Sequence, residues 1–246
     1  MTRKVAVVGM GHVGATVAHY LVSGGFVDEL VLFDTNEAKV NSDALDLRDA
    51  MANLPTHTNL YVNDWDQVAD CDVVISALGK SKLVDTPDHD RFAEFKFTRT
   101  QVPVVGQKLK DHGFYGNLVV ITNPCDVITA MYQKATGLPK HQVLGTGTLL
   151  DSARMRATVG ETLHVDSRSV VGYNLGEHGN SQFSLVDGPR LRQALTGVLK
   201  ATSRSQGGPG RDGRTGPAGG LHGLQGQEVY QLRSGHGGGA LNGDDA

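Results

Sequence analysis

The chain has 246 residues, and its 23 Lys and Arg against 26 Asp and Glu give a formal net charge of −3, so we expect no nucleic-acid partner and no binding to a membrane surface. Its two cysteines exclude a disulfide framework and a cysteine-rich zinc site, and we expect no metal. Because neither a signal peptide nor an apolar run of membrane-spanning length is present, the sequence predicts a cytoplasmic protein with a small-molecule partner.

Short, β-branched apolar runs recur through the first part of the chain, and stretches with helical spacing separate them. The runs lie at residues 5–9, 30–34, 59–63, 72–79, 117–122 and 142–146. Nearly continuous apolar runs are typical of strands buried on both faces of a parallel sheet. With right-handed crossovers, they predict an α/β fold with a doubly wound parallel sheet over residues 1–147.

A glycine-rich sequence, GMGHVG, directly follows the first run and supplies Gly9, Gly11 and Gly14. At the start of a helix, this pattern presents backbone N–H groups to a pyrophosphate. Asp34 ends the second run, where its carboxylate can bind ribose hydroxyls and repel a 2′-phosphate, which favours NAD over NADP. The alternative is an ordinary tight turn followed by an aspartate that caps a helix.

A polar stretch over residues 79–91 follows the fourth run, and loops of this length often cover a site. Arg91 at its end is a candidate to polarise a substrate carbonyl, or else a surface residue that begins a helix. Asn123 precedes Pro124 after the fifth run, at the sheet edge where doubly wound folds bind ligands. Taken alone, Asn123-Pro124 is equally compatible with a simple turn.

Three further candidates lie in LLDSAR and LGEHGNS, which contain Asp151, Arg154 and His178. An imidazole held by a carboxylate can exchange a proton with a substrate oxygen near neutral pH. An arginine can bind a carboxylate through two parallel hydrogen bonds. The three residues together predict acid/base chemistry on a small anion, whereas any one alone is better explained as a helix cap or a core histidine.

Taken in order, six motifs of the chain resemble the L-lactate/malate dehydrogenase family, and most closely its L-2-hydroxyisocaproate dehydrogenase branch. They are GMGHVG, LFD, DRFAEFKF, ITNPCDVIT, GTGTLLDSARMR and GYNLGEHGNSQF, and the resemblance runs from about residue 3 to Phe183. It implies a Rossmann domain that binds NAD and an oxidoreductase that transfers a hydride between NAD(H) and a 2-hydroxy or 2-oxo acid. It also implies a homo-oligomer, a dimer or a tetramer.

The resemblance further implies a role for each candidate residue. His178 is the proton donor and acceptor, and Asp151 orients its imidazole. Arg154 binds the substrate carboxylate, Arg91 polarises the carbonyl, and Asn123 contacts the substrate oxygen or the nicotinamide end of the cofactor. The peptide bond before Pro124 is expected to be cis.

The chain changes character after Phe183, where the resemblance stops. Residues 184–246 hold 16 of the 32 glycines and no Phe, Trp, Met, Ile or Cys, so we expect a disordered tail after an incomplete α+β substrate domain over residues 148–183. With permitted codons, SLVDGPRLRQAL read one nucleotide later becomes AWSTVRVYGKPL, which resembles the family's next segment. The hypothesis is a shifted reading frame near Phe183, which sequencing the coding DNA there would test.

Three functional hypotheses remain open. The first is an NAD-dependent L-2-hydroxyacid dehydrogenase, which we expect to be weak or inactive in this chain because the family's segment after Phe183 is missing. It is expected to prefer aliphatic monocarboxylates, because no arginine lies between Lys80 and Asp90 to bind a second carboxylate, while Leu83 and Val84 offer apolar surface there. The second is a catalytically dead NAD-binding fragment that associates with intact family subunits through residues 36–50. The third is malate dehydrogenase, which would prefer oxaloacetate.

Overall fold

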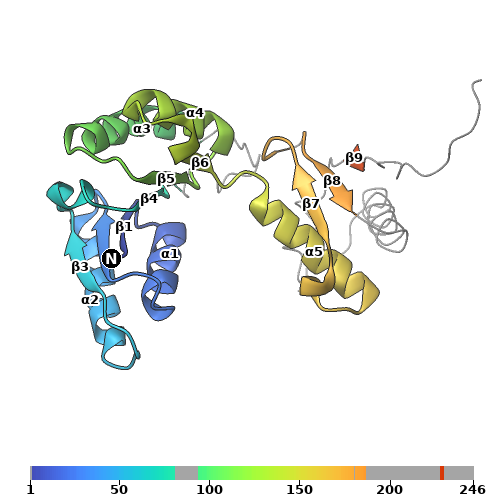
Figure 1. The fold of residues 1–246 in the computed structure, drawn as a ribbon, viewed down its shortest axis with the longest axis horizontal. Helices are drawn as coiled ribbons and strands as arrows, with labels where there is room; N and C mark the ends of the chain where they lie inside the picture. The colour runs from blue at the N-terminus through green and yellow to red at the C-terminus, as the bar shows by residue number, and fades with distance from the viewer. Residues whose placement is uncertain (1, 81–93, 180, 187–227, 230–246) are drawn as a thin grey trace, which may run out of the picture. The chain divides into compact units, whose positions relative to one another are not determined.

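The computed structural model of the chain describes residues 2–80, 94–179, 181–186 and 228–229. The chain forms two compact units, unit 1 over Met1–Gly147 and unit 2 over Thr148–Ala246, and each is described by itself (Figure 1). The predicted domains, an NAD-binding domain over residues 1–147, an incomplete substrate domain over 148–183 and a tail over 184–246, stay predictions.

Unit 1 contains six strands that alternate with helices along the sequence. The strands are β1 (Lys4–Val8), β2 (Glu29–Phe33), β3 (Asn59–Val62), β4 (Val73–Ser76), β5 (Asn117–Val120) and β6 (Val143–Gly145). The α-helices are α1 (His12–Ser23), α2 (Glu37–Met51), α3 (Phe95–Asp111) and α4 (Cys125–Thr136). Two short 3-10 helices, η1 (Trp65–Val68) and η3 (Lys140–Gln142), complete the described part of the unit.

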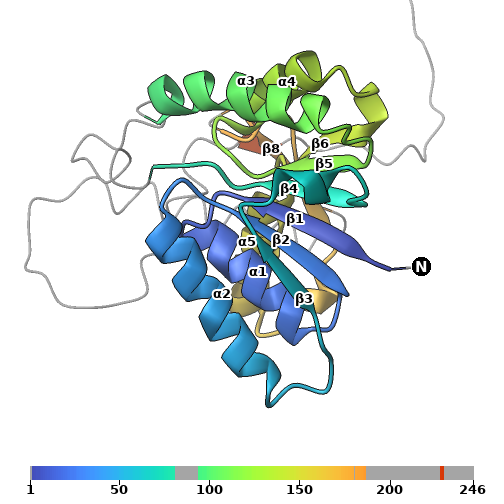
Figure 2. The same ribbon diagram turned by 90° about the vertical axis from the view of Figure 1, so that its left-hand side faces the viewer.

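The six strands form one parallel sheet in the order β3-β2-β1-β4-β5-β6. Helices α1 and α2 cover one face, and α3 and α4 cover the other (Figure 2). The prediction of a doubly wound parallel sheet is confirmed. The strand order reverses between β1 and β4, and the carboxyl ends of the strands at such a reversal form the ligand crevice of doubly wound folds.

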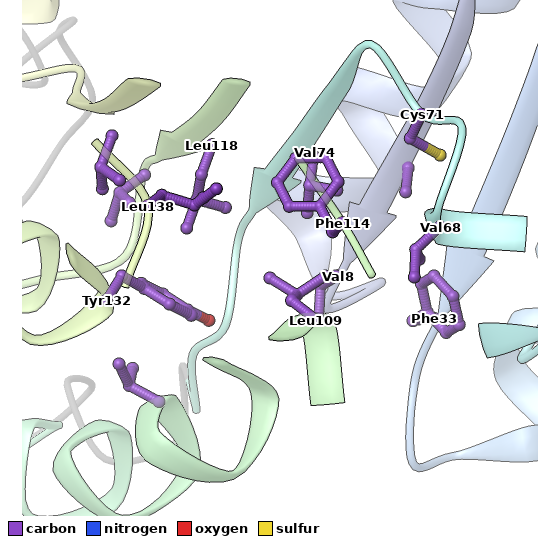
Figure 3. Close-up of a cluster of buried hydrophobic side chains, with 14 of the residues drawn as sticks. Val8, Phe33, Val68, Cys71, Val74, Leu109, Phe114, Leu118, Tyr132 and Leu138 are labelled. Carbon is purple, nitrogen blue, oxygen red and sulfur yellow. The ribbon is translucent and has the colours of Figure 1, made fainter. Parts of the chain in front are cut away.

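Alternate residues of each central strand enter two separate hydrophobic cores. In β1, Val5 and Val7 belong to the core beneath α1 and α2, while Ala6 and Val8 belong to the core beneath α3 and α4. Successive side chains of a strand point to opposite faces, so a strand buried on both sides reads as a continuous apolar run. Figure 3 shows the second core, in which the ring of Tyr132 reaches in among aliphatic side chains such as Leu109 and Leu118.

Local signals in the sequence explain where two of the helices begin or end. The side chain of Asn36 accepts a hydrogen bond from the N–H of Lys39, which caps the start of α2. Gly137 ends α4 in the left-handed region, with φ of 72°, a conformation that glycine adopts at no steric cost. The start of α2 and the end of α4 are therefore fixed by local sequence.

Unit 2 contains helix α5 (Leu149–Leu163), the 3-10 helix η4 (Ser167–Ser169) and three strands, β7 (Gly172–Leu175), β8 (Phe183–Val186) and β9 (Glu228–Val229). The strand order is β7-β8-β9, with β7 and β8 antiparallel and β9 parallel to β8. Strand β7 is an edge strand of this small sheet. It packs along α5 (Figure 1).

The tail predicted to be disordered from residue 184 contains two of these strands. Ser184 is fully buried and its Oγ donates to Oδ1 of Asn174 at 2.6 Å, so the chain stays ordered to the end of β8 at Val186. Glu228 and Val229 form β9. The rest of the predicted tail, residues 187–227 and 230–246, lies outside the described residues.

No helix in the described ranges is both long and apolar enough to cross a bilayer.

Candidate active site

The three glycines of GMGHVG lie at the turn from β1 into α1, and their surroundings differ. Gly9 has φ of 96°, and a Cβ there would lie 2.7 Å from the carbonyl oxygen of Ala77. A Cβ on Gly14 would lie 1.8 Å from the carbonyl oxygen of Gly9, whereas one on Gly11 would meet nothing within 4 Å. Gly9 and Gly14 are therefore needed for close packing, while Gly11 leaves open space beside the backbone.

That open space lies at the start of α1, where the first N–H groups of a helix have no partner within the helix. Gly11 is the N-cap residue of α1 and has no side chain to cap them. An anion placed there would accept hydrogen bonds from these N–H groups, and the helix dipole would stabilise its charge. The turn fits the pyrophosphate of a dinucleotide by this criterion.

Asp34 follows β2 and is tied to the glycine turn. Its Oδ2 accepts the N–H of Met10 at 2.7 Å, and its Oδ1 accepts the N–H of Asn36 at 2.8 Å. The N–H of Asp34 donates to Oδ1 of Asn63 at 3.0 Å. The carboxylate is half-buried and held beside the turn, in the position that a ribose-binding group requires.

A cavity of about 470 Å³ opens at these strand ends, and Gly9, Gly11 and Asp34 line it. Its volume lies within the range of small-molecule sites, about 300 to 1,000 Å³. Trp65 also lines it, and its indole stacks on Phe33 with ring centroids 4.1 Å apart, while Nζ of Lys108 lies 4.8 Å from the indole centroid. Five residues of α3 line the cavity: Phe97, Gln101, Val104, Val105 and Lys108.

The α3 residues were missed as candidates from the sequence. Phe97 ends the DRFAEFKF motif, which gave it no role of its own, and the other lining residues of α3 showed only helical spacing, as in ordinary amphipathic helices. The fit of the cavity to a nucleotide therefore depends on a helix face that the motifs did not assign to the site.

Asn123 lies between β5 and α4, at the same carboxyl edge of the sheet as Gly9 and Asp34. Its peptide bond to Pro124 is cis, as the family resemblance implied. The carbonyl oxygen of Asn123 accepts the hydroxyl of Thr98 at 3.4 Å, and the residue itself is exposed. Its amide is available at the edge where ligands of this architecture bind.

Just below that edge, three hydroxyls meet inside the core. Oγ of Ser76 lies 2.9 Å from the hydroxyl of Tyr132 and 3.2 Å from Oγ1 of Thr122. Burial raises the pKa of the Tyr132 phenol, and the hydrogen bond to Ser76 offsets only part of that shift. The ends of β4 and β5, which precede the candidate site, are thus joined through a side chain of α4.

In unit 2, Nδ1 of His178 lies 2.6 Å from Oδ2 of Asp151. Asp151 belongs to the first turn of α5 and its side chain is 3% exposed, while His178 follows β7 and its side chain is 13% exposed. An ionised carboxylate only accepts hydrogen bonds, so Nδ1 carries the hydrogen. Nε2 is then the ring atom that gains or loses a proton in acid/base work.

Of the two candidate arginines, Arg154 belongs to the described residues and Arg91 does not. Arg154 is exposed on α5, three residues after Asp151, and side chains at this spacing lie on the same side of a helix. Arg91 lies outside the described residues, together with Leu83 and Val84. The chemical roles of the candidate residues stay predictions.

Comparison with known proteins identifies relatives of this arrangement. Residues 3–145 match the family model of the NAD-binding domain of lactate/malate dehydrogenases. L-lactate dehydrogenase 3 of Bacillus cereus is 38% identical over 181 residues, which make up 74% of this chain and 56% of that protein. The chain thus spans a little over half the length of this curated relative.

Two solved structures extend the likeness to the fold. The minor L-lactate dehydrogenase of Enterococcus mundtii in its ligand-bound form aligns with a TM-score of 0.71 and 31% identity, over 83% of this chain and 72% of that one. The lactate dehydrogenase of Cryptosporidium parvum, solved with lactic acid and nicotinamide adenine dinucleotide, aligns with a TM-score of 0.70 and 27% identity, over 81% and 63% of the two chains.

Proposed function

Because the chain belongs to the lactate/malate dehydrogenase family, we propose that it interconverts a small L-2-hydroxy acid and the matching 2-oxo acid with NAD(H). The family's NAD-binding domain is present and NAD is its cofactor. The observation that carries the proposal is the 2.6 Å contact between Nδ1 of His178 and Oδ2 of Asp151. A cytoplasmic location and a homo-oligomeric assembly belong to the same proposal.

When bound, the nicotinamide ring supplies or accepts the hydride at C4, and the substrate carbon that exchanges it is C2. The chain's own residues handle the proton and the charges. For reduction of the 2-oxo acid, His178 donates the proton from Nε2 to the substrate oxygen; for oxidation of the hydroxy acid, neutral His178 accepts it. Asp151 holds the imidazole through Nδ1 and stabilises the imidazolium.

The remaining roles concern the substrate's own charges. Arg154 binds the carboxylate, and a guanidinium suits this task because it donates two parallel hydrogen bonds. Arg91 polarises the carbonyl, and Asn123 contacts the substrate oxygen or the nicotinamide end. Preference for an aliphatic monocarboxylate, from pyruvate to branched acids of the 2-oxoisocaproate type, is supported by the absence of arginine between Lys80 and Asp90. Malate dehydrogenase is the alternative within the family.

The test is oxidation of NADH by the purified full chain with pyruvate, 2-oxoisocaproate or oxaloacetate. We expect His178→Asn to lower kcat by about 10²- to 10⁴-fold, the usual contribution of a positioned proton donor. His141→Asn, which changes an exposed histidine of η3, is the control and should leave kcat unchanged. Equal rates for the two variants would refute the role of His178, and a preference for oxaloacetate would favour the malate alternative.

A second candidate function is an NAD-binding protein without turnover. Three apolar side chains on one side of the β7 segment, Val171, Tyr173 and Leu175, are 60%, 56% and 39% exposed among the described residues. Exposed apolar surface of this kind marks an interface or a poorly packed region. This candidate predicts that NADH quenches the fluorescence of Trp65, the single tryptophan, while none of the three acids oxidises NADH.

A further inference from the structure

The first turn of α5 carries two hydroxyls that bind the edge of β7 on either side of the candidate catalytic aspartate. Oγ1 of Thr148 donates to the carbonyl oxygen of Asn174 at 2.6 Å, and the N–H of Asn174 donates to Oγ of Ser152 at 2.8 Å. Strand β7 lies at the edge of its sheet, where backbone groups facing outward have no partner strand. Both outward groups of Asn174 are therefore satisfied by α5.

Two more hydrogen bonds close this arrangement, which we call the hydroxyl clamp (Thr148, Ser152, Asn174 and Ser184). Oγ of Ser152 donates to the carbonyl oxygen of Thr148 at 2.8 Å, and Oγ of Ser184 donates to Oδ1 of Asn174 at 2.6 Å. Ser152, Asn174 and Ser184 are buried. Bonds of this kind are stronger away from water, and the clamp joins α5, β7 and β8 at one point.

Thr148 shows that the clamp is not an ordinary helix cap. It occupies the N-cap position of α5, where a threonine hydroxyl normally accepts an N–H of its own helix. Here the side chain makes no such bond and donates to β7 instead. The hydroxyl is thus used to fix the helix against the strand.

The residues of the clamp flank both members of the candidate catalytic pair in the sequence. Asp151 lies between Thr148 and Ser152 on the same turn, and His178 follows Asn174 by only four residues, with Gly176 at φ of 95° between them. A chain that contains glycine samples many conformations unless it is anchored close by. With Asn174 fixed to α5, little freedom remains to separate the imidazole from the carboxylate.

We propose that Thr148 and Ser152 are positioning residues that hold Oδ2 of Asp151 at Nδ1 of His178 by clamping Asn174 to α5. The proposal rests on the proposed function for its relevance to catalysis. Its physical content, the coupling of the clamp to the histidine–aspartate hydrogen bond, is independent of turnover.

The test uses the full chain with ¹⁵N-labelled histidine and follows the Nδ1–H of His178 by NMR. Thr148→Val removes the clamp hydroxyl at nearly constant shape, and Thr148→Ser restores it. Thr158→Val is the matched control, because Thr158 is also half-buried on α5 and its Oγ1 donates within the helix to the carbonyl oxygen of Arg154 at 3.0 Å.

We expect exchange of this proton with water to be about fivefold faster or more in Thr148→Val, the ratio that corresponds to loss of one ordinary hydrogen bond. The wild-type rate should return in Thr148→Ser and persist in Thr158→Val. Amide exchange in unit 1, measured in the same samples, should not change. Ser152→Ala should repeat the effect and gives a second, independent way to open the clamp.

Two results would overturn the proposal: the same exchange rate in Thr148→Val as in wild type, or a wild-type Nδ1–H that exchanges too fast to observe. A purely structural role for Thr148 would lower the melting temperature and leave the His178 proton unchanged. If the chain turns over, Thr148→Val should also lower kcat about fivefold with KM unchanged. If it does not turn over, the proposed function fails and the NMR result still decides the clamp.

Discussion

Gly14 approaches Gly9 so closely that a Cβ on Gly14 would lie 1.8 Å from the Gly9 carbonyl oxygen, so α1 can follow β1 this tightly only without a side chain at residue 14. At Gly11, two turn positions after Gly9, an added Cβ meets nothing within 4 Å. The same substitution should therefore have opposite consequences at the two positions.

We predict that Gly14→Ala lowers the free energy of unfolding by about 1 to 3 kcal/mol, the usual cost of overpacking. Gly11→Ala should keep the stability of wild type but weaken NADH binding by about tenfold or more, because the methyl group occupies the space where a pyrophosphate approaches the backbone. Urea unfolding and NADH titration, both followed by Trp65 fluorescence, separate the two effects. Equal NADH affinity in Gly11→Ala and wild type would contradict the assignment of this turn.

Asp34 should determine the choice between NAD and NADP. At an effective dielectric constant of about 20, two unit charges 4 Å apart repel by about 4 kcal/mol, so a carboxylate beside the ribose strongly disfavours a 2′-phosphate. We expect Asp34→Ser to shift the ratio of NADPH to NADH affinity by at least about tenfold towards NADPH, measured by titration of each cofactor.

Glu37→Gln is the control for Asp34→Ser, because Glu37 lines the same cavity from the first turn of α2. Removing its charge should change the ratio much less if the effect comes from the ribose position. An equal shift in both variants would mean that the cavity discriminates by its total charge rather than through Asp34.

The sheet of unit 1 could be predicted from the sequence because its strands are buried on both faces. The side chains of a run such as Val5–Val8 pack into two cores, one on each face of the sheet. Nearly every position of the run is therefore apolar, which makes the strand easy to recognise in the sequence. The glycine turn and Asp34 could also be predicted, since the glycine spacing follows from contact of a helix start with a pyrophosphate and the position of Asp34 from contact with the ribose.

The hairpin of unit 2 could not be predicted in the same way. Its buried face carries Asn174 and Ser184, polar residues that a hydrophobic pattern does not assign to a core, and they are buried because they bind each other and the hydroxyls of α5. Such complementarity depends on pairing between segments, which a single sequence does not reveal. The lining of the cavity by α3 was missed for a related reason: the DRFAEFKF motif reaches only Phe97, and the rest of this helix face shows nothing beyond amphipathic spacing.

Cys71 should make the protein less stable at alkaline pH. It is 3% exposed, and burial raises the pKa of its thiol to about 12 from an ordinary value of 9.0. A raised pKa in the folded state means that the thiol favours folding fully below pH 9, and that this contribution is lost as pH rises from about 9 to about 12, because the unfolded chain releases the proton first.

The free energy of unfolding of wild type should therefore fall more steeply above pH 9 than that of Cys71→Val, which has no proton to release at this position. Urea unfolding at a series of pH values measures the difference. Tyr132 also has a raised pKa and adds to the alkaline decline in both proteins, so only the difference between them reports on Cys71. Parallel curves would show that the thiol ionises as readily in the folded state as in the unfolded one.

Tyr132→Phe should isolate the contribution of the buried hydroxyl cluster below the candidate site. The substitution keeps the ring in the core and removes only the hydroxyl 2.9 Å from Oγ of Ser76. Ser76 still has Thr122 within 3.2 Å, so no partner is left wholly unsatisfied, and we expect a loss of about 1 kcal/mol in the free energy of unfolding.

Tyr20→Phe is the control, because the Tyr20 side chain stacks on Phe26 at the surface and the residue is 64% exposed, and its change should stay within about 0.5 kcal/mol. A loss in Tyr132→Phe no larger than in this control would mean that Ser76 and Thr122 satisfy each other without the phenol. The ends of β4 and β5 would then be held by the backbone ladder alone, and the cluster would have no part in placing Asn123.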